Sequence, residues 1–453
     1  MYLNRGGFNL RRQRRDRLSW VALYVILIMG GLYVFSMIGP DEPLHPIGVA
    51  TATATRSSQS YSAEAEKQFS AGQLEQAVEA YKRAIEADPL RIEYRIRLAR
   101  IQVYAGQTEA AVITATDAIL LDPNNSTAHA VHALALDWTS NYPDASDAAV
   151  RAIQLDANNA LAHAYYAEIL VDQQRWAQAG DEARQALTLD PNSMDAYRVY
   201  GYYLEATSNY EEAIQAYQSA LKINPNLAFL YMQIGVNYRT LAVKAETLEE
   251  QERDFDLAIQ YFQRASGINP LDIGPYLSIA RTYVQMGQYG AASQYLEEAL
   301  KIDPANARVH GELGKVYFKA LNYESAIIEL KCAIDGCSTT EDTVDDEEGA
   351  PVFNIEPLQL DTNADAATLE TYYIYSSILA ALSTPENPHC QRARPLIAQI
   401  RVWVQQNDPE NPVVFGILDE NEAVCSIAEA TATAAFLTGN VTPSATPTGT
   451  PTP

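Results

Sequence analysis

Positive charge is scarce beyond the N-terminus of this 453-residue sequence. The chain has 32 Lys and Arg against 57 Asp and Glu, for a net charge of -25. Residues 1–17 hold six Arg and one Asp, so the rest of the chain carries -30. Because a nucleic acid needs a basic surface to bind, this composition argues against nucleic acid as a partner. It fits a soluble surface that repels itself.

The sequence also lacks the common motifs of catalytic and cofactor sites. We find no G-x-G-x-x-G, G-x-x-x-x-G-K-[ST], H-E-x-x-H or G-x-S-x-G pattern. The acidic residues within 338–366 do not follow the D-x-D-x-D-G framework of a calcium loop, so we interpret this segment as a solvated loop. We therefore expect no enzymatic activity, no cofactor and no metal site.

Cysteine is rare and confined to the C-terminal third of the chain. The four residues are Cys332, Cys337, Cys390 and Cys425, and no C-x-x-C pair suggests zinc. An even number of cysteines outside the cytoplasm predicts two disulfides. Three connectivities are open, and we favour Cys332–Cys337 with Cys390–Cys425 because each closes a short or moderate loop.

An uncharged stretch at residues 18–39, LSWVALYVILIMGGLYVFSMIG, follows the basic segment 1–17. Twenty-two helical residues span roughly 33 Å, enough to cross a bilayer. Positive charge before the span predicts a cytoplasmic N-terminus. We expect a single-pass cell-membrane protein whose residues after the linker 40–57 lie outside the cytoplasm. The alternative is a cleaved signal peptide, but the nearest small-x-small site, at residues 50–52, lies well beyond the apolar stretch.

Small residues recur with a period of 34 along most of the chain. The period is broken once, by a step of 45 between Ala213 and Ala258. The first column is Ala77, Ala111, Ala145, Ala179, Ala213, Ala258, Ala292 and Ala326. A second column lies seven residues later, from Ala84 to Ala333, and a third lies twelve residues earlier in most windows, from Ala65 to Gly314. Pro preceded by Asp or Asn closes most windows, as at Asp88-Pro89.

Each window contains two apolar-periodic stretches, so it predicts two helices. Two short helices cannot bury their faces alone and must stack on the neighbouring pairs. Small residues fit where helix backbones approach closely, large ones such as Tyr81, Tyr217 and Phe262 fill the gaps, and Pro ends the second helix. The fold class predicted is an all-α solenoid of about eight helix pairs.

This pattern resembles the tetratricopeptide repeat family. Residues 209–226 (NYEEAIQAYQSALKINPN) and 322–334 (NYESAIIELKCAI) are similar to the second helix of that repeat, and the resemblance covers residues 58–334. It implies right-handed superhelical stacking with a concave groove for peptides or partner proteins. The family's aromatic residue near the start of the first helix becomes His at His129, His163 and His310, which we interpret as packing substitutes.

The segments outside the regular windows complete the predicted organisation. Eleven extra residues near 243–253 extend the hairpin of the sixth pair, either as a solvated extension or as a partner contact. The solenoid occupies 58–337, the acidic loop 338–366, an atypical helical cap 367–427, and a Thr/Pro-rich disordered tail 428–453.

The first helices of the pairs are expected to line the concave side. One helical face of the first four windows is acidic, whereas on the last four it is basic and aromatic. The predicted partner-binding groove is Arg198, Tyr202, Phe229, Arg239, Arg281, Arg308, Lys315, Phe318 and Lys319. Two interpretations are open: the basic groups neutralise neighbouring acidic helices, or they bind an acidic peptide segment or polyanionic polymer through charge-assisted contacts and aromatic anchors.

We therefore predict a membrane-anchored scaffold for protein–protein interactions. The alternatives are an architectural protein whose solenoids self-associate, and an accessory subunit of an envelope enzyme complex.

Overall fold

The computed structural model describes residues 24–30, 33, 56–337, 354–384 and 386–437. The chain divides into two compact units, Met1–Arg56 and Ser57–Pro453. In the first unit, residues 24–30 and 33 are helical and exposed. No helix in the described ranges is both long and apolar enough to span a bilayer. Most of the predicted transmembrane segment 18–39 and linker 40–57, and all of the basic segment 1–17, lie outside the described residues.

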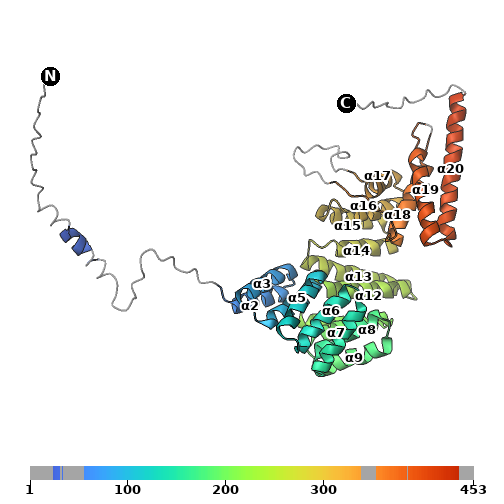
Figure 1. Cartoon of the computed structure of the whole chain (residues 1–453). Helices are drawn as coiled ribbons and strands as arrows, with labels where there is room; N and C mark the ends of the chain where they lie inside the picture. The colour runs from blue at the N-terminus through green and yellow to red at the C-terminus, as the bar shows by residue number, and fades with distance from the viewer. Residues whose placement is uncertain (1–23, 31–32, 34–55, 338–353, 385, 438–453) are drawn as a thin grey trace, which may run out of the picture. The chain divides into compact units, whose positions relative to one another are not determined.

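The second unit is all-α and begins with the predicted succession of helix pairs (Figure 1). In each pair the two helices pack against each other, and each pair packs on the next. The pairs are α2 (Ser58–Ser70) with α3 (Leu74–Ala87), α4 (Ile92–Tyr104) with α5 (Thr108–Leu121), α6 (Ser126–Trp138) with α7 (Tyr142–Leu155), α8 (Ala160–Asp172) with α9 (Trp176–Leu189), α10 (Met194–Ala206) with α11 (Tyr210–Ile223), α12 (Ala228–Lys244) with α13 (Leu248–Ile268), α14 (Gly274–Gln285) with α15 (Tyr289–Ile302), and α16 (Ala307–Lys319) with α17 (Tyr323–Asp335). We number these pairs as repeats one to eight.

The periodic small residues lie where the sequence pattern predicts. Every Ala of the first and second columns is fully buried. In the third column, a Cβ added at Gly235 would lie 2.5 Å from the Phe262 ring, and one at Gly314 would lie 2.6 Å from Leu330. The first helix of a pair therefore needs a small residue opposite a large side chain of the second helix.

The ends of the helices also follow the sequence. Asn125, Asn159 and Asn306 cap first helices through their side chains, which accept hydrogen bonds from backbone N–H groups. Most second helices end at the Asp or Asn that precedes the closing Pro, as α3 does at Asp88, whereas α7 ends at Asp156 before Ala157 and α17 ends at Gly336. This confirms the predicted turn between repeats.

The histidines at the aromatic position of the first helices, His129, His163 and His310, form hydrogen bonds with neighbouring groups of the stack. His163 hydrogen-bonds Glu182 on the second helix of its pair, at 2.5 Å, and the Ala157 carbonyl oxygen, at 3.0 Å. His310 makes the equivalent contacts to Glu329 and Pro304. Tyr231 reaches the Pro225 carbonyl oxygen from the same position of its repeat. Within the described ranges, no group of three or more metal-ligating side chains is present.

The eleven extra residues lengthen the sixth pair, as predicted. α12 has 17 residues and α13 has 21, whereas the regular pairs combine helices of 13 and 14. Lys244, at the tip of α12, lies 4.3 Å from the centre of the Tyr210 ring in the preceding pair. The extended end of α12 therefore contacts the preceding helix pair, as the regular helices do.

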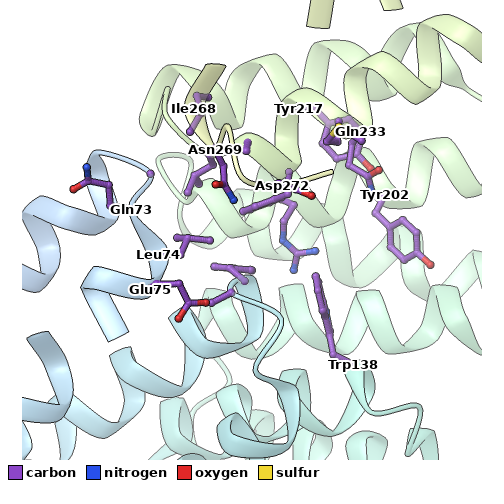
Figure 2. Close-up of a pocket in the computed structure, with 18 of the residues that line it drawn as sticks. Gln73, Leu74, Glu75, Trp138, Tyr202, Tyr217, Gln233, Ile268, Asn269 and Asp272 are labelled. Atoms are coloured by element: carbon purple, nitrogen blue, oxygen red, sulfur yellow. The ribbon is translucent and has the colours of Figure 1, made fainter. Parts of the chain in front are cut away.

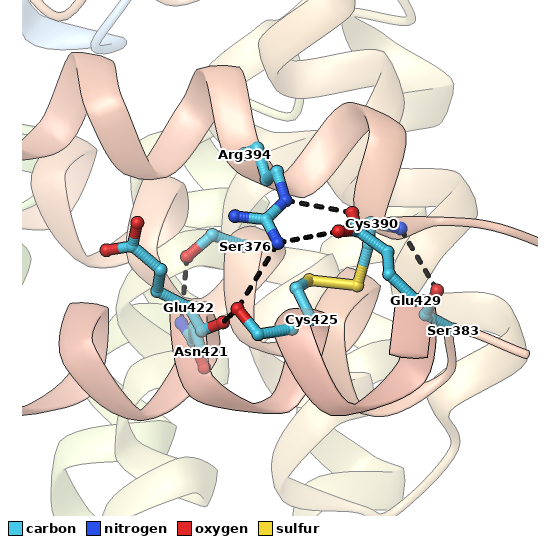
Figure 3. The surroundings of a disulfide bond; sticks show 9 residues. Ser376, Ser383, Cys390, Arg394, Asn421, Glu422, Cys425 and Glu429 are labelled. Atoms are coloured by element: carbon cyan, nitrogen blue, oxygen red, sulfur yellow. Dashed lines mark hydrogen bonds and ion pairs between the residues drawn. A yellow bond between two sulfur atoms is a disulfide. The ribbon is translucent and has the colours of Figure 1, made fainter. Parts of the chain in front are cut away.

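A cap of three helices, α18 (Ala366–Ala381), α19 (Cys390–Asn407) and α20 (Pro412–Leu437), follows the repeats. A disulfide joins Cys390 of α19 to Cys425 of α20, and Arg394 pairs with Glu429 beside it (Figure 3). The second disulfide joins Cys332, within α17 of the last repeat, to Cys337 just after that helix. Both are the pairings we favoured.

The boundary of the cap corrects the sequence prediction. We placed the tail at 428–453, but α20 continues past residue 427 to Leu437. Residues 428–437, AEATATAAFL, are rich in Ala, which favours helix, and the first Pro of the tail is Pro443. Residues 338–353 of the acidic loop and 438–453 of the tail lie outside the described residues.

Candidate binding surfaces

The first six repeats curve until side chains distant in sequence meet across their inner face. Tyr104 on α4 and Tyr165 on α8 both donate hydrogen bonds to Asp195 on α10. At the edge of this curved stack, the Asn226 side chain donates a hydrogen bond to the Ser70 carbonyl oxygen at 2.8 Å. The turn between α2 and α3 therefore touches the turn between α11 and α12.

This curvature encloses a cavity of about 1160 Å³ (Figure 2). Figure 2 shows Gln73, Leu74 and Glu75 on one side of it and Tyr202 and Tyr217 on the other. Its aromatic lining is Tyr104, Trp138, Tyr202, Tyr217 and Phe229. Its charged lining is Glu75, Asp137, Glu168, Asp172, Arg198 and Asp272. The cavity is therefore aromatic and mainly acidic.

Three of the predicted groove residues lie in this cavity, and each already has a partner. Arg198 is 5 % exposed and forms a two-fold ion pair with Glu168, with nitrogen–oxygen distances of 2.7 and 2.5 Å. Tyr202 donates to Asp172, and Phe229 stacks on Tyr104 with ring centres 5.1 Å apart. Burial and the bond to Asp172 raise the pKa of Tyr202, so this hydroxyl stays protonated.

Arg239 and Arg281 form a different arrangement on α12 and α14. The Arg239 guanidinium lies 5.6 Å from the centre of the Phe262 ring and donates weakly to the Ser278 carbonyl oxygen, at 3.4 Å. Burial and the neighbouring charge of Arg281 lower the pKa of Arg239 to about 10. Arg281 is exposed. Neither guanidinium forms an ion pair with any residue that the structure describes.

The remaining predicted residues lie on α16, and two of them bind the cap. Arg308 pairs with Asp365 at 2.7 Å, and buried Lys315 pairs with Glu312 and with Glu370 of α18. Phe318 packs against Tyr323. Lys319 is exposed at the end of α16. The nine predicted residues thus form three separate groups rather than one continuous groove.

Two aromatic residues of the cavity, Tyr104 and Trp138, are not among the predicted groove residues. Tyr104 and Trp138 occupy the last position of their first helices, which belongs to the face we selected. The predicted groove included aromatic residues of the last four windows alone, although these two occupy an equivalent position in earlier windows. The meeting of repeats two and five depends on the curvature of the stack, which a single repeat does not encode.

Comparisons with known proteins identify the class. Tetratricopeptide repeat profiles match residues 68–135, 131–193, 167–228 and 280–320. The chain therefore contains tetratricopeptide repeats, and scaffolds built from such repeats are typically non-catalytic. Its fold is similar to that of human IFIT1, solved as a dimer with m7Gppp-AAAA, at 15 % identity and a TM-score of 0.53, over 83 % of this chain and 90 % of that one.

Two further structures match with lower TM-scores. The Cut9-Hcn1 hetero-tetramer of the APC/C matches at 17 % identity and a TM-score of 0.49. The match covers 62 % of this chain and 53 % of that one, so this chain spans about half the length of that protein. Pseudomonas aeruginosa pilF matches at 21 % identity and 0.37, over 46 % of this chain and 90 % of that one.

Proposed function

We propose that the protein is a membrane-anchored scaffold that binds an acidic segment of a partner protein at Arg239 and Arg281. The observation that supports this most strongly is that Arg239 and Arg281 lie near enough for the charge of Arg281 to lower the pKa of Arg239, while neither forms an ion pair with a carboxylate of the described residues. Two like charges this close repel each other, and burial adds to the cost. A carboxylate from outside would relieve both effects and could accept paired hydrogen bonds from each guanidinium.

The chain itself contains an example of the same recognition. Asp365, which caps α18, and Glu370 within α18 bind Arg308 and Lys315 of the last repeat. The cap thus supplies an acidic segment to the basic face of the eighth repeat. The Arg239–Arg281 site lies on the sixth and seventh repeats, where the described part of the chain supplies no such segment.

The anchor belongs to the same proposal and is supported by the sequence. The six Arg of residues 1–17 precede the uncharged stretch 18–39, which orients the repeats outside the cytoplasm. Protease added to intact cells or spheroplasts should digest the repeats and spare residues 1–17. Full protection of the repeats would contradict this orientation, and a mature N-terminus near residues 50–55 would indicate a secreted form.

The binding site is tested by charge reversal in the full-length protein. Arg239→Glu with Arg281→Glu should abolish capture of cross-linked partners, because the site becomes acidic and repels an acidic segment. The matched control is Lys82→Glu with Lys301→Glu, an equal charge change at exposed positions on α3 and α15. Capture by the wild-type protein and by the control should weaken as salt rises. Equal capture by the Arg239/Arg281 variant, with its helical circular dichroism retained, would exclude this site.

Self-association is the second candidate, since an acidic surface on one copy could supply the carboxylates for the arginine pair of another. The net charge of -25 makes such surfaces abundant. Light scattering on the wild type and on the Arg239/Arg281 variant separates the two functions. A wild-type oligomer that dissociates in the variant favours self-association, and a monomer in both favours a different partner.

A further inference from the structure

The first helices of consecutive repeats are linked by side-chain bonds along much of the stack. Trp138 of α6 and Arg198 of α10 both bind Glu168 of α8. Asn237 of α12 is fully buried and donates a hydrogen bond to Glu205 of α10 at 2.8 Å. Each repeat from the third to the sixth is therefore joined to its neighbour by at least one bond between first helices.

These links weaken at α14, the first helix of the seventh repeat. Within the described ranges, α12 and α14 share a single hydrogen bond, from Arg239 to the Ser278 carbonyl oxygen at 3.4 Å. No hydrogen bond, ion pair or ring contact joins α14 to α16 in the same ranges. The links resume between α16 and α18, where Lys315 pairs with Glu370. α14 is therefore bonded, and weakly, to one of the two first helices beside it.

The sequence explains why this link is missing. Arg281 lies eleven residues before the first-column Ala of its repeat, the position that Glu168 and Lys315 hold in theirs. Glu168 and Lys315 each form an ion pair with the first helix that follows, α10 and α18 respectively. The residue of α16 that corresponds to Arg198, the partner of Glu168, is Gly311. At the position that would supply a partner for Arg281, α16 therefore has no side chain.

Free carboxylates are also lacking on the three first helices concerned. α12 and α14 contain no Asp or Glu. The single acidic residue of α16, Glu312, binds Lys315 at 2.9 Å. Arg239 and Arg281 therefore repel each other across the boundary between α12 and α14, and no carboxylate of these helices offsets the repulsion. Because a solenoid is stabilised by the interfaces between neighbouring repeats, it bends most easily where such an interface is weak.

We propose that the seventh repeat is a hinge, and that an acidic partner segment bound between Arg239 and Arg281 closes it. A carboxylate at this place accepts hydrogen bonds from both guanidinium groups and supplies the strong link that α12 and α14 lack. The segment therefore binds the closed arrangement more tightly than the open one, which is the condition for a ligand to shift a conformational equilibrium. This inference rests on the proposed function, and it adds that partner binding stiffens repeats six to eight.

Distances between spin labels on the full-length protein, measured by pulsed electron paramagnetic resonance, test the hinge. Asp256→Cys with Glu324→Cys places labels at exposed positions two residues before the first-column Ala of repeats six and eight. Glu109→Cys with Ala177→Cys places them at the same exposed position of repeats two and four, as the matched control. All native cysteines form disulfides, so the labels attach to the introduced residues.

Acetyl-hexaglutamate-amide is the acidic probe, and acetyl-hexaglutamine-amide is its neutral control. In the free protein the distance distribution should be broad for repeats six and eight and narrow for repeats two and four. Hexaglutamate should narrow the first distribution and leave the second unchanged, whereas hexaglutamine should change neither. Calorimetry on the same samples separates the two possible failures. Binding of hexaglutamate without narrowing would overturn the hinge and leave the proposed function standing, whereas absence of binding would contradict both.

A single substitution tests the same hinge without any peptide. Arg281→Glu places a carboxylate beside Arg239 within the chain, so the distribution for repeats six and eight should be narrow in the free variant, and hexaglutamate should not narrow it further. Arg281→Gln removes the repulsion without supplying a carboxylate, so its distribution should stay broader than that of Arg281→Glu. Equal distributions in both variants and the wild type would also overturn the hinge.

Discussion

Arg100 of the second repeat forms an ion pair with Asp195 of the fifth, although 95 residues separate them in the sequence. Asp195 is 3 % exposed, and it also accepts the hydroxyl groups of Tyr104 and Tyr165. One carboxylate therefore connects three helices that belong to different repeats. The curvature that encloses the acidic cavity depends on this connection as well as on the packing of neighbouring pairs.

Asp195→Ala should destabilise the first six repeats. The change leaves the Arg100 guanidinium and two buried tyrosine hydroxyls without their acceptor, which typically costs about 3–5 kcal/mol for a buried ion pair. Hydrogen exchange should accelerate in α4, α8 and α10, while the cap helices are unaffected. Asp181→Ala removes an equivalent Arg–Asp pair at an exposed position and should cost about 1 kcal/mol or less. Equal effects of the two variants would mean that the central network does not stabilise the curvature.

Gly72→Ala should open the contact between the first and sixth repeats. Gly72 has φ +78°, and a Cβ there would overlap the Asn226 carbonyl oxygen. Gly106 lies at the same position of the next repeat with φ +75°, and a Cβ there would meet nothing within 4 Å. Gly106→Ala therefore carries the same backbone strain without the collision.

The difference between the two glycine variants isolates the contact itself. Hydrogen exchange of α2 and α3, measured by mass spectrometry, should increase more in Gly72→Ala than in Gly106→Ala. The scattering radius of gyration should also rise in Gly72→Ala alone. If both variants behave alike, the contact between Gly72 and Asn226 does not contribute to stability.

Loss of the Cys390–Cys425 disulfide should loosen the cap without unfolding the repeats. Cys425 of α20 is fully buried, and its bond to Cys390 of α19 closes a loop of 35 residues. Removal of a native disulfide typically costs about 2–5 kcal/mol in a small domain, and repeats in a solenoid are stabilised mainly by their neighbours. A Cys390→Ala/Cys425→Ala variant should show faster exchange in α20 and unchanged exchange in α4 to α10. Global loss of helicity would contradict this account.

The regular part of the fold could be predicted because every repeat obeys the same local rule. The buried Ala columns, the Asp-Pro turns and the lengthened sixth pair all follow from residues within one window. The groove was harder to predict, because most of its side chains contact residues of other repeats or of the cap. Arg198 and Glu168 lie on the first helices of adjacent repeats, which the 34-residue period predicts to be neighbours, whereas Asp195 meets Arg100 only through three repeats of accumulated curvature. Lys315 binds Glu370 of the cap, a segment outside the periodic pattern.

Site-specific photo-cross-linking tests the scaffold proposal most directly. A photoreactive amino acid at Ser278, whose carbonyl oxygen contacts Arg239, places the probe beside the arginine pair, and one at Glu298 on α15 places it on an exposed second helix. In cells, the Ser278 probe should form a discrete adduct whose partner peptide is rich in Asp or Glu, and Arg239→Glu with Arg281→Glu should abolish that adduct. Equal adducts from both probe positions, or an adduct that survives the charge reversal, would contradict the proposal that this protein recruits its partner through Arg239 and Arg281.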